Sequence, residues 1–451
     1  MTMNIISTHA SDLRLLVSTA ALLAALAVLV MRLLKGGSAA GGRVPPMSAR
    51  VGAVMLALFA FTTVATVVGT PRFGVDGPLS GVSLLPLKLL LAAILAATLA
   101  CAVFCGLDRG SIRVERSVAV TVLPFAGVWA VSAAFGSGRG LDSQTWIAWG
   151  VFATLACLPV EGSTLVRQAR TLLRFLMWGS LTAAALSPAW AFAPYEVAAG
   201  GWLGHAPRLQ GLMPDPNPLG WTAAFAVVLE RDAAKKTTAK LARSAPAFAC
   251  LVLSGSRMAI FALVIGFCIC ASYRDKGTAP PSRSGLRVYR GVALSAAALA
   301  IYLVGDDSPQ GETFNGRTDR WSGAFTTWLA NPLFGTGPDA YSNGHNQVLH
   351  TAAELGLVGL ISLAWLTVRA LRCSFRSPVR GSRVLLTVLV TLYPTENPLR
   401  FTTPAYLLPL LPPLLAMVAA QHTRRPSRAL TPVGRPLPDR RGCTVGAELV
   451  S

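Results

Sequence analysis

Long apolar stretches recur along almost the whole 451-residue chain, separated by short polar segments. A helix needs about 20 apolar residues to cross a bilayer, with a range of about 17–25. The stretches at 218–230, 244–254 and 384–395 are shorter, so we expect them to be broken, re-entrant or extended into polar flanks. The full pattern predicts spans at 15–34, 51–70, 84–106, 117–135, 143–159, 171–190, 218–230, 244–254, 257–273, 287–304, 347–368, 384–395 and 403–420.

Alanine and leucine dominate these stretches, which favours helices over a transmembrane barrel. The chain is 53% hydrophobic and only 13% charged, against about 25% charged in soluble domains. This composition excludes a soluble enzyme on a single anchor and predicts an all-α, polytopic helical bundle of about 12–13 spans. We expect a transmembrane helical domain at 1–420 and a basic, disordered cytoplasmic tail at 421–451.

The net charge of +20 comes from 40 Lys and Arg against 20 Asp and Glu. Thirty-one of the basic residues cluster in alternate loops and in the tail, which the positive-inside rule places in the cytoplasm. Most of the charge therefore sets orientation and indicates no nucleic-acid partner. The N-terminus is then outside if the number of spans is odd. Nine basic residues are not explained by orientation: Arg14, Arg72, Lys88, Arg139, Arg208, Arg257, Arg317, Arg320 and Arg400.

Sequence signatures of a nucleotide-driven pump or a metalloprotease are missing. The chain has no GxxxxGK[ST] phosphate loop, no HExxH and, among eight cysteines, no CxxC pair. We therefore predict neither a cofactor nor a bound metal.

The first polar constellation on the expected outer side is RLQGLMPDPNPLG at 208–220. Asn217 suits a helix N-cap and Pro218 suits the first helical position. Those two residues could serve structure alone. Arg208 needs a partner, because an arginine near lipid is costly.

The second constellation is a tight turn, Ser254-Gly255-Ser256-Arg257. Ser254 or Ser256 can cap the next helix, and Arg257 then opens it. A helix N-terminus is already partly positive, so Arg257 with a second arginine would form an anion site. The alternative is an arginine that snorkels to the interface.

The third constellation follows the longest outer loop, 305–345. It begins with Arg317 and Arg320 and continues through NPLFGTG at 331–337 to HNQVLHTAAELGLVG at 345–359. His345 meets a helix start, where a histidine can exchange a proton at neutral pH, unless it is a plain loop histidine. Asn346 suits the cap of that helix. Glu354, further along that helix, either pairs with a buried arginine or histidine or takes part in chemistry, with His350 in support.

In this order the motifs resemble the O-antigen ligase and O-antigen polymerase superfamily of bacterial integral-membrane glycosyltransferases, with the likeness best over about 200–370. The resemblance implies a bundle in the bacterial inner membrane with its active site facing the periplasm. It implies transfer of a glycan from an undecaprenyl-diphosphate lipid to a hydroxyl of a glycan or lipid-glycan acceptor. Carried over by motif, Arg208 and Arg257 bind the diphosphate and His345 is the base. Arg317 and Arg320 lie just before that histidine.

Two features depart from the family pattern. The turn reads Ser-Gly-Ser-Arg where Thr-Gly-Ser-Arg is more usual, and the spans exceed the dozen or so of ligases. The clean His345-to-Gly356 segment favours a ligase of lipopolysaccharide assembly over a polymerase of the same superfamily. A polysaccharide transporter or flippase is the further alternative. It is disfavoured because we find no inverted repeats.

The orientation is directly testable. We expect the substitution Ala340→Cys, in the loop 305–345, to react in intact cells with a thiol reagent that cannot cross the membrane. Failure of this labelling, with a cysteine in the 369–383 segment reacting instead, would reverse the topology.

Overall fold

The computed structural model describes residues 47–72, 74–75, 93, 116–135, 143–157, 162–194, 206–233, 237–272, 317–338, 345–377, 380–400 and 404–421. The spans expected at 15–34 and 287–304 lie outside the described residues, and so does the span at 84–106 apart from residue 93. So do residues 305–316 and 339–344 of the long loop and all but the first residue of the 421–451 tail.

Helices make up nearly all of the described structure, which confirms the predicted all-α class. They are α2 (Met47–Val68), α4 (Arg116–Phe135), α5 (Ser143–Cys157), α6 (Gly162–Leu186), α7 (Pro188–Ala191), α8 (Pro216–Ala233), α9 (Thr237–Leu253), α10 (Arg257–Ser272), α12 (Arg317–Ala330), α13 (Gln347–Arg376), α14 (Arg380–Leu392), the 3-10 helix η2 (Pro404–Leu410) and α15 (Leu411–Gln421). Two short strands, β1 (Phe192–Ala193) and β2 (Arg208–Leu209), pair antiparallel with Ala193 opposite Arg208.

Three of the described helices are long and apolar enough to cross a membrane, judged by length and composition: Arg50–Val68, Val118–Phe135 and Gln347–Arg376. Five further apolar helices are shorter, and they include two of the three stretches that the sequence marked as short, those at 244–254 and 384–395. The chain is thus an integral membrane protein with a mixture of full-length and short apolar helices.

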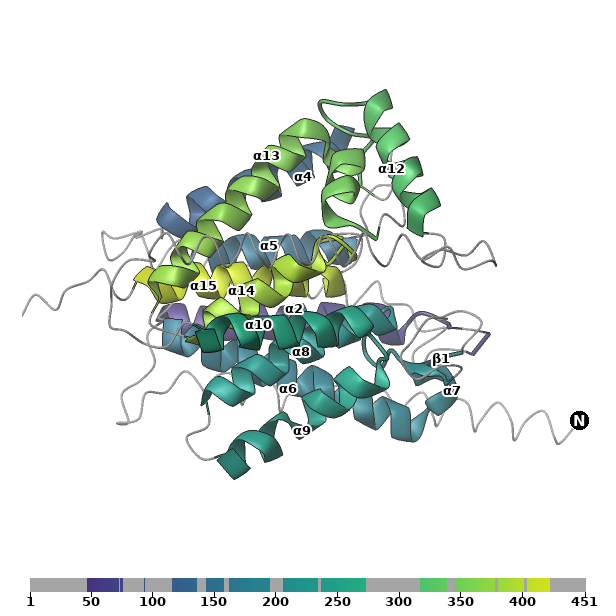
Figure 1. The fold of residues 1–451 in the computed structure, drawn as a ribbon, viewed down its shortest axis with the longest axis vertical. Coiled ribbons are helices and arrows are strands. Elements are labelled where there is room, and N and C mark those ends of the chain that lie inside the picture. Colours follow the sequence, from purple (N-terminus) through teal and green to yellow (C-terminus); the bar gives the residue numbers. More distant parts are fainter. Residues whose placement is uncertain are drawn as a thin grey trace, which may run out of the picture.

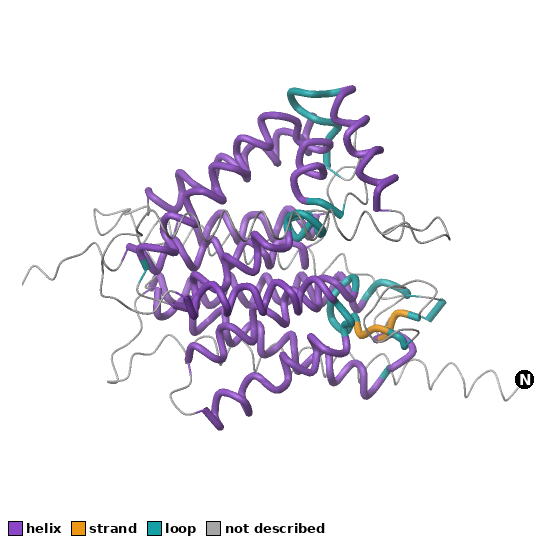
Figure 2. The backbone as a smooth tube through the Cα atoms, viewed as in Figure 1, coloured by secondary structure: helices purple, strands orange, loops and turns teal. Residues whose placement is uncertain are grey.

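Most helices run side by side in one bundle, while α4 and α13 lie along one flank of it (Figure 1). The helix α12 stands beyond α13 at the end of the bundle where α7 and β1 also lie, and the loops between helices gather at this end (Figures 1 and 2). The motifs of all three constellations therefore belong to one end of the molecule.

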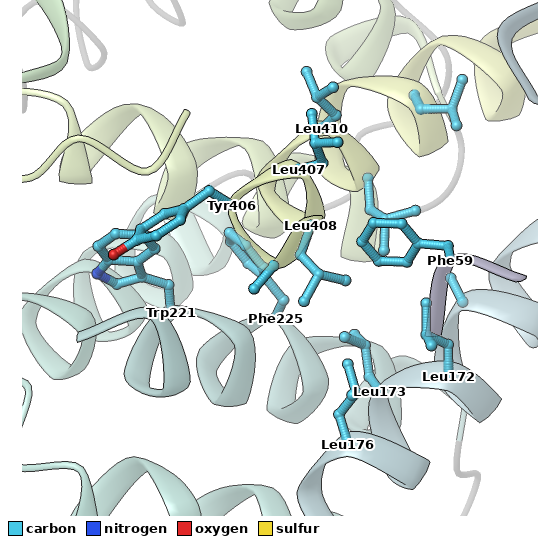
Figure 3. Packing of buried hydrophobic residues seen from close by; sticks show 14 of the residues in the cluster. Phe59, Leu172, Leu173, Leu176, Trp221, Phe225, Tyr406, Leu407, Leu408 and Leu410 are labelled. Carbon is cyan, nitrogen blue, oxygen red and sulfur yellow. The ribbon is translucent and has the colours of Figure 1, made fainter. Parts of the chain in front are cut away.

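The core of the bundle is aromatic and aliphatic, with the 3-10 helix η2 packed into it (Figure 3). Leu407 and Leu408 of η2 are fully buried, and Leu408 lies beside Phe225 of α8. The Tyr406 ring lies 6.2 Å from that of Trp221, centroid to centroid. The last apolar stretch thus holds the bundle together from inside.

The charge pattern suggested that a loop contains Arg167, Arg170 and Arg174. In the structure these residues lie within α6 instead. Arg174 forms a salt bridge with the buried Glu230 of α8, and Arg170 Nε donates to the Leu229 carbonyl at 3.1 Å. Because Arg170 and Arg174 have partners within the bundle, the helix can start nine residues before the expected apolar span at 171–190.

The helix α13 is broken at Gly356, whose φ of 62° and ψ of −159° are not helical. The break frees backbone groups on both sides, and the segment 331–337 takes them up. Thr336 and Gly337 donate backbone N–H groups to the carbonyls of Ala353 and Glu354, at 2.9 and 3.0 Å. On the other side, Leu357 and Val358 donate to Pro332 and Leu333, at 2.8 and 3.2 Å.

Glycine is required on both sides of this contact. A Cβ on Gly356 would lie 2.3 Å from the Leu333 carbonyl carbon, and one on Gly335 would lie 2.3 Å from that of Glu354. Both glycines also have φ above 60°. The glycines of the NPLFGTG and ELGLVG motifs thus let two backbones approach closely.

We expect Gly356→Ala to destabilise the protein strongly. The left-handed backbone alone costs on the order of 1–3 kcal/mol, and the added methyl overlaps backbone that cannot swing away. Thermal unfolding in detergent, followed by circular dichroism, should show a clearly lower midpoint. The matched control is Gly127→Ala in α4, where a Cβ meets nothing within 4 Å. An equal unfolding midpoint for Gly356→Ala and Gly127→Ala would contradict the close backbone contact at Gly356.

Candidate functional site

The first and second constellations meet at Arg208. Its buried guanidinium donates from Nε to the Ser254 carbonyl at 2.8 Å and from an Nη to Asn217 Oδ1 at 2.6 Å. Glycine permits this approach, because a Cβ on Gly255, whose φ is 62°, would lie 3.1 Å from Arg208 Nε. The turn 254–256 also packs onto α8, where a Cβ on Gly220 would lie 2.5 Å from that of Ser256.

Arg72, which the charge pattern left unexplained, supports the loop that follows Arg208. It donates to the carbonyls of Gly211, at 3.0 Å, and Met213, and its guanidinium stacks 4.4 Å from the Trp190 ring centroid. Burial lowers the pKa of Arg72 to about 10, and the Asp215 carboxylate partly opposes this shift. The guanidinium therefore keeps its charge at neutral pH and has a structural role.

Asn217 is not the N-cap of α8, contrary to the sequence expectation. The helix begins at Pro216, and the Asp215 side chain accepts the Asn217 N–H at 3.0 Å. Proline fits this earlier start because its fixed φ suits the first helical position. Asn217 is instead a bridge: its Oδ1 accepts from Arg208, and its Nδ2 lies 3.4 Å from both carboxylate oxygens of Glu396.

Arg257 opens α10, as expected, and is exposed at its N-terminus. The serines before it cap the helix only weakly. Ser254 Oγ accepts the Ser256 N–H at 3.4 Å, while the buried Ser256 Oγ has no hydrogen-bond partner in the described structure.

His345 lies between a cation and a carboxylate. An Nη of Arg320, from α12, is 2.6 Å from His345 Nε2, and Glu396 Oε2 is 3.9 Å from His345 Nδ1. Arginine only donates, so Nε2 accepts, and the proton of the neutral ring is on Nδ1, toward Glu396. His345 holds a φ of 41°, uncommon for a residue other than glycine. The backbone is thus strained at the residue that the motif marks as the base.

Glu396 is the residue that sequence reasoning missed. It follows α14, is 2% exposed, and contacts both Asn217 and His345. It joins Arg208, Asn217, His345 and Arg320 into one chain of contacts from four separate parts of the sequence. A signal was present: a carboxylate between two apolar stretches indicates a residue that either pairs with another group or takes part in chemistry, the alternatives given for Glu354.

Asn346 is the N-cap of α13, as predicted. Its Oδ1 accepts the N–H groups of Val348 and Leu349 at 2.9 and 3.1 Å. Its Nδ2 donates to the Pro394 carbonyl at 3.0 Å, and the Gln347 N–H donates to the Tyr393 carbonyl at 2.8 Å. The start of α13 is therefore tied to the segment that carries Glu396.

His350 and Glu354 form a buried pair one turn apart within α13, with His350 Nε2 3.3 Å from Glu354 Oε2. This is the pairing that the sequence offered as the structural alternative for Glu354. Arg317 is the first residue of α12, and its side chain lies outside what the structure describes. Across the described ranges, no three His, Cys, Asp or Glu residues are grouped to hold a metal ion.

The family comparison covers the second and third constellations. Residues 244–364 match the model of the family described as Wzy_C, O-antigen ligase, which confirms the resemblance to the O-antigen ligase superfamily. The comparison with curated proteins gave no match. The match contains Arg257, Arg320 and His345, while Arg208 and Glu396 lie outside it. Over the residues that it covers, the match supports a membrane glycosyltransferase of the O-antigen ligase and polymerase type.

We expect Asn346→Ala to lower stability by about 1 kcal/mol, the typical cost of losing a polar N-cap. Two N–H groups at the start of α13 lose their acceptor, and the link to Pro394 is lost with them. The measurement is the thermal unfolding midpoint in detergent. Asn346→Ser retains a capping oxygen and should recover most of the loss. A midpoint for Asn346→Ala equal to that of the native chain would show that the cap is not needed.

Proposed function

We propose that this protein moves a glycan from an undecaprenyl-diphosphate lipid to an acceptor hydroxyl on the outer side of the bacterial inner membrane. The observation that carries the proposal is the connected set Arg208, Asn217, Glu396, His345 and Arg320. Asn217 and His345 contact the buried Glu396 carboxylate directly, and Arg208 and Arg320 contact these two residues in turn.

Arginines suit a diphosphate leaving group. As the glycosidic bond breaks, negative charge gathers on the departing phosphate oxygens, and guanidinium forks match that geometry while staying charged. Arg208 is held in place by Ser254 and Asn217, so it does not have to be ordered when the donor binds. In this proposal Arg257, which is exposed at the start of α10 three residues after Ser254, extends the same anion-binding surface. In this proposal the arginines stabilise the charge without a metal.

His345 suits the proton transfer. The acceptor hydroxyl gives its proton to Nε2 as its oxygen attacks the anomeric carbon in a single, inverting displacement. Glu396 faces the Nδ1 side and favours the imidazolium that forms. In the structure, Arg320 donates to His345 Nε2. Its guanidinium must therefore turn away before reaction, and the donor diphosphate is the anion that would draw it.

The identity of the acceptor distinguishes the ligase hypothesis from the polymerase hypothesis. A ligase transfers the glycan to a lipid-glycan acceptor, and a polymerase extends another lipid-linked glycan. A transporter would move the lipid-linked glycan without forming a glycosidic bond. The segment from His345 to Gly356, which keeps the motif of the family without interruption, favours the ligase hypothesis.

We expect His345→Ala to slow transfer by on the order of 10²–10⁴-fold, because general-base catalysis contributes about this much. Arg208→Lys should weaken donor use, because lysine cannot reproduce the fork that bonds both Ser254 and Asn217. The assay contains purified protein in proteoliposomes, an undecaprenyl-diphosphate-linked oligosaccharide and a lipid-glycan acceptor. It measures both the product and the released undecaprenyl diphosphate.

The matched control is Arg369→Lys in the last part of α13, whose guanidinium stacks on Trp365. This change conserves charge away from the proposed site and should leave transfer intact. Undiminished transfer by His345→Ala would remove the histidine from its proposed role. Elongated lipid-linked glycan as the product would identify a polymerase, and movement of donor without transfer would identify a transporter.

A further inference from the structure

The helix α12 carries an apolar strip that the described structure leaves uncovered. Phe325 and Leu329, one turn apart, are 46% and 59% exposed. Leu333 and Phe334, just after the helix, are 56% and 68% exposed. Trp328 lies beside this strip, with its ring 5.7 Å from that of Phe325. Exposed apolar groups gathered in this way mark an interaction surface.

The other sides of α12 have a different character. Ala324 is fully buried, and Arg320, one turn before it, contacts His345, so this side faces the bundle. Ser322 and Thr326 are exposed on a polar strip next to the apolar one. At 100° per residue the helix is thus divided into a bundle side, an apolar side and a water side.

The apolar strip continues the lipid-facing surface of α13. Leu357, Ile361 and Trp365 are exposed at successive turns of this candidate membrane-spanning helix. The Leu357 and Val358 N–H groups donate to the Pro332 and Leu333 carbonyls, so Leu333 and Phe334 follow directly on the end of that stripe. From Leu333 the strip passes one turn back to Leu329 on α12.

A second candidate membrane-spanning helix, α4, also exposes apolar residues near the break in α13. Ser132 Oγ, near the end of α4, donates to the Glu354 carbonyl at 3.1 Å, just before the break in α13. Phe135, one turn further along α4, is highly exposed. The neighbouring spans α4 and α13 therefore both expose apolar residues as far as the break at Gly356. The segment that follows α12 contacts α13 at this break.

From this continuity we propose that α12 lies in the interfacial layer of the bilayer, with Phe325, Leu329, Leu333 and Phe334 in contact with the acyl chains. An interfacial helix has an apolar face toward lipid and a polar face toward water, and aromatic residues favour this depth. The polar strip of Ser322 and Thr326 beside the apolar strip fits a lipid–water boundary. The contact fixes the depth of Arg320, and with it the depth of the Arg320–His345 pair. It does not depend on the proposed reaction.

The test uses the photoreactive amino acid benzoylphenylalanine in the full-length chain, reconstituted into phosphatidylethanolamine and phosphatidylglycerol vesicles that contain an acyl-labelled phospholipid. The probe replaces Phe325 in one variant and the adjacent Thr326 in another. Both positions are exposed, so neither change removes a buried contact. The probe at Ile361, in the middle of the α13 stripe, is the positive control.

We expect a labelled lipid adduct at position 325 comparable with that at 361 and several-fold above that at 326. A probe at Leu329 should repeat the result at 325. A lipid adduct at 361 without one at 325 and 329 would overturn the proposal. A cross-link from 325 to another segment of the chain or to a second copy would also overturn it, because protein would then cover the strip. Since glycan transfer is not measured, failure here leaves the proposed function standing.

Discussion

The structure at the motif-bearing end depends on a helix that is broken and then sealed by backbone hydrogen bonds. The break at Gly356 leaves carbonyl and N–H groups of α13 without helical partners, which is costly in an apolar setting. The segment 331–337 supplies partners for both halves of the helix. This contact sets the course of the chain from α12 into α13. It therefore determines where Arg320 stands relative to His345.

The backbone contact between segment 331–337 and α13 also explains why two glycine-containing motifs occur near each other in this region of the sequence. NPLFGTG and ELGLVG are two sides of one backbone contact, and their glycines are fixed by space rather than by chemistry. By contrast, Arg320 and His345 carry the groups that we propose act on the diphosphate and on the acceptor hydroxyl. The region that matches the O-antigen ligase family thus contains two kinds of residue. The glycines are required by the close backbone contact, and the charged side chains by the proposed reaction.

The sequence predicted the described helices well where apolar length decides them, as for α2, α4 and α5. It misplaced the start of α6, because arginines that count as loop charge can be satisfied by Glu230 within the bundle. It identified Arg208 and His345 by motif but not the residue between them. Glu396 contacts His345 directly and Arg208 through Asn217, and this three-dimensional proximity is not encoded in any local spacing. Asn217 was assigned the wrong contact for the same reason, since its partners lie 9 and 179 residues away.

The position of Glu396 has a consequence for the order of assembly. A membrane protein is made from its N-terminus, and the segment that carries Glu396 follows α14, close to the C-terminal end of the bundle. Arg208 and His345 are synthesised and inserted well before the carboxylate that connects them. A partly synthesised chain therefore holds the motifs of the family without the electrostatic connection between them. The site is completed only when the last helices are in place, so that truncated copies cannot assemble it.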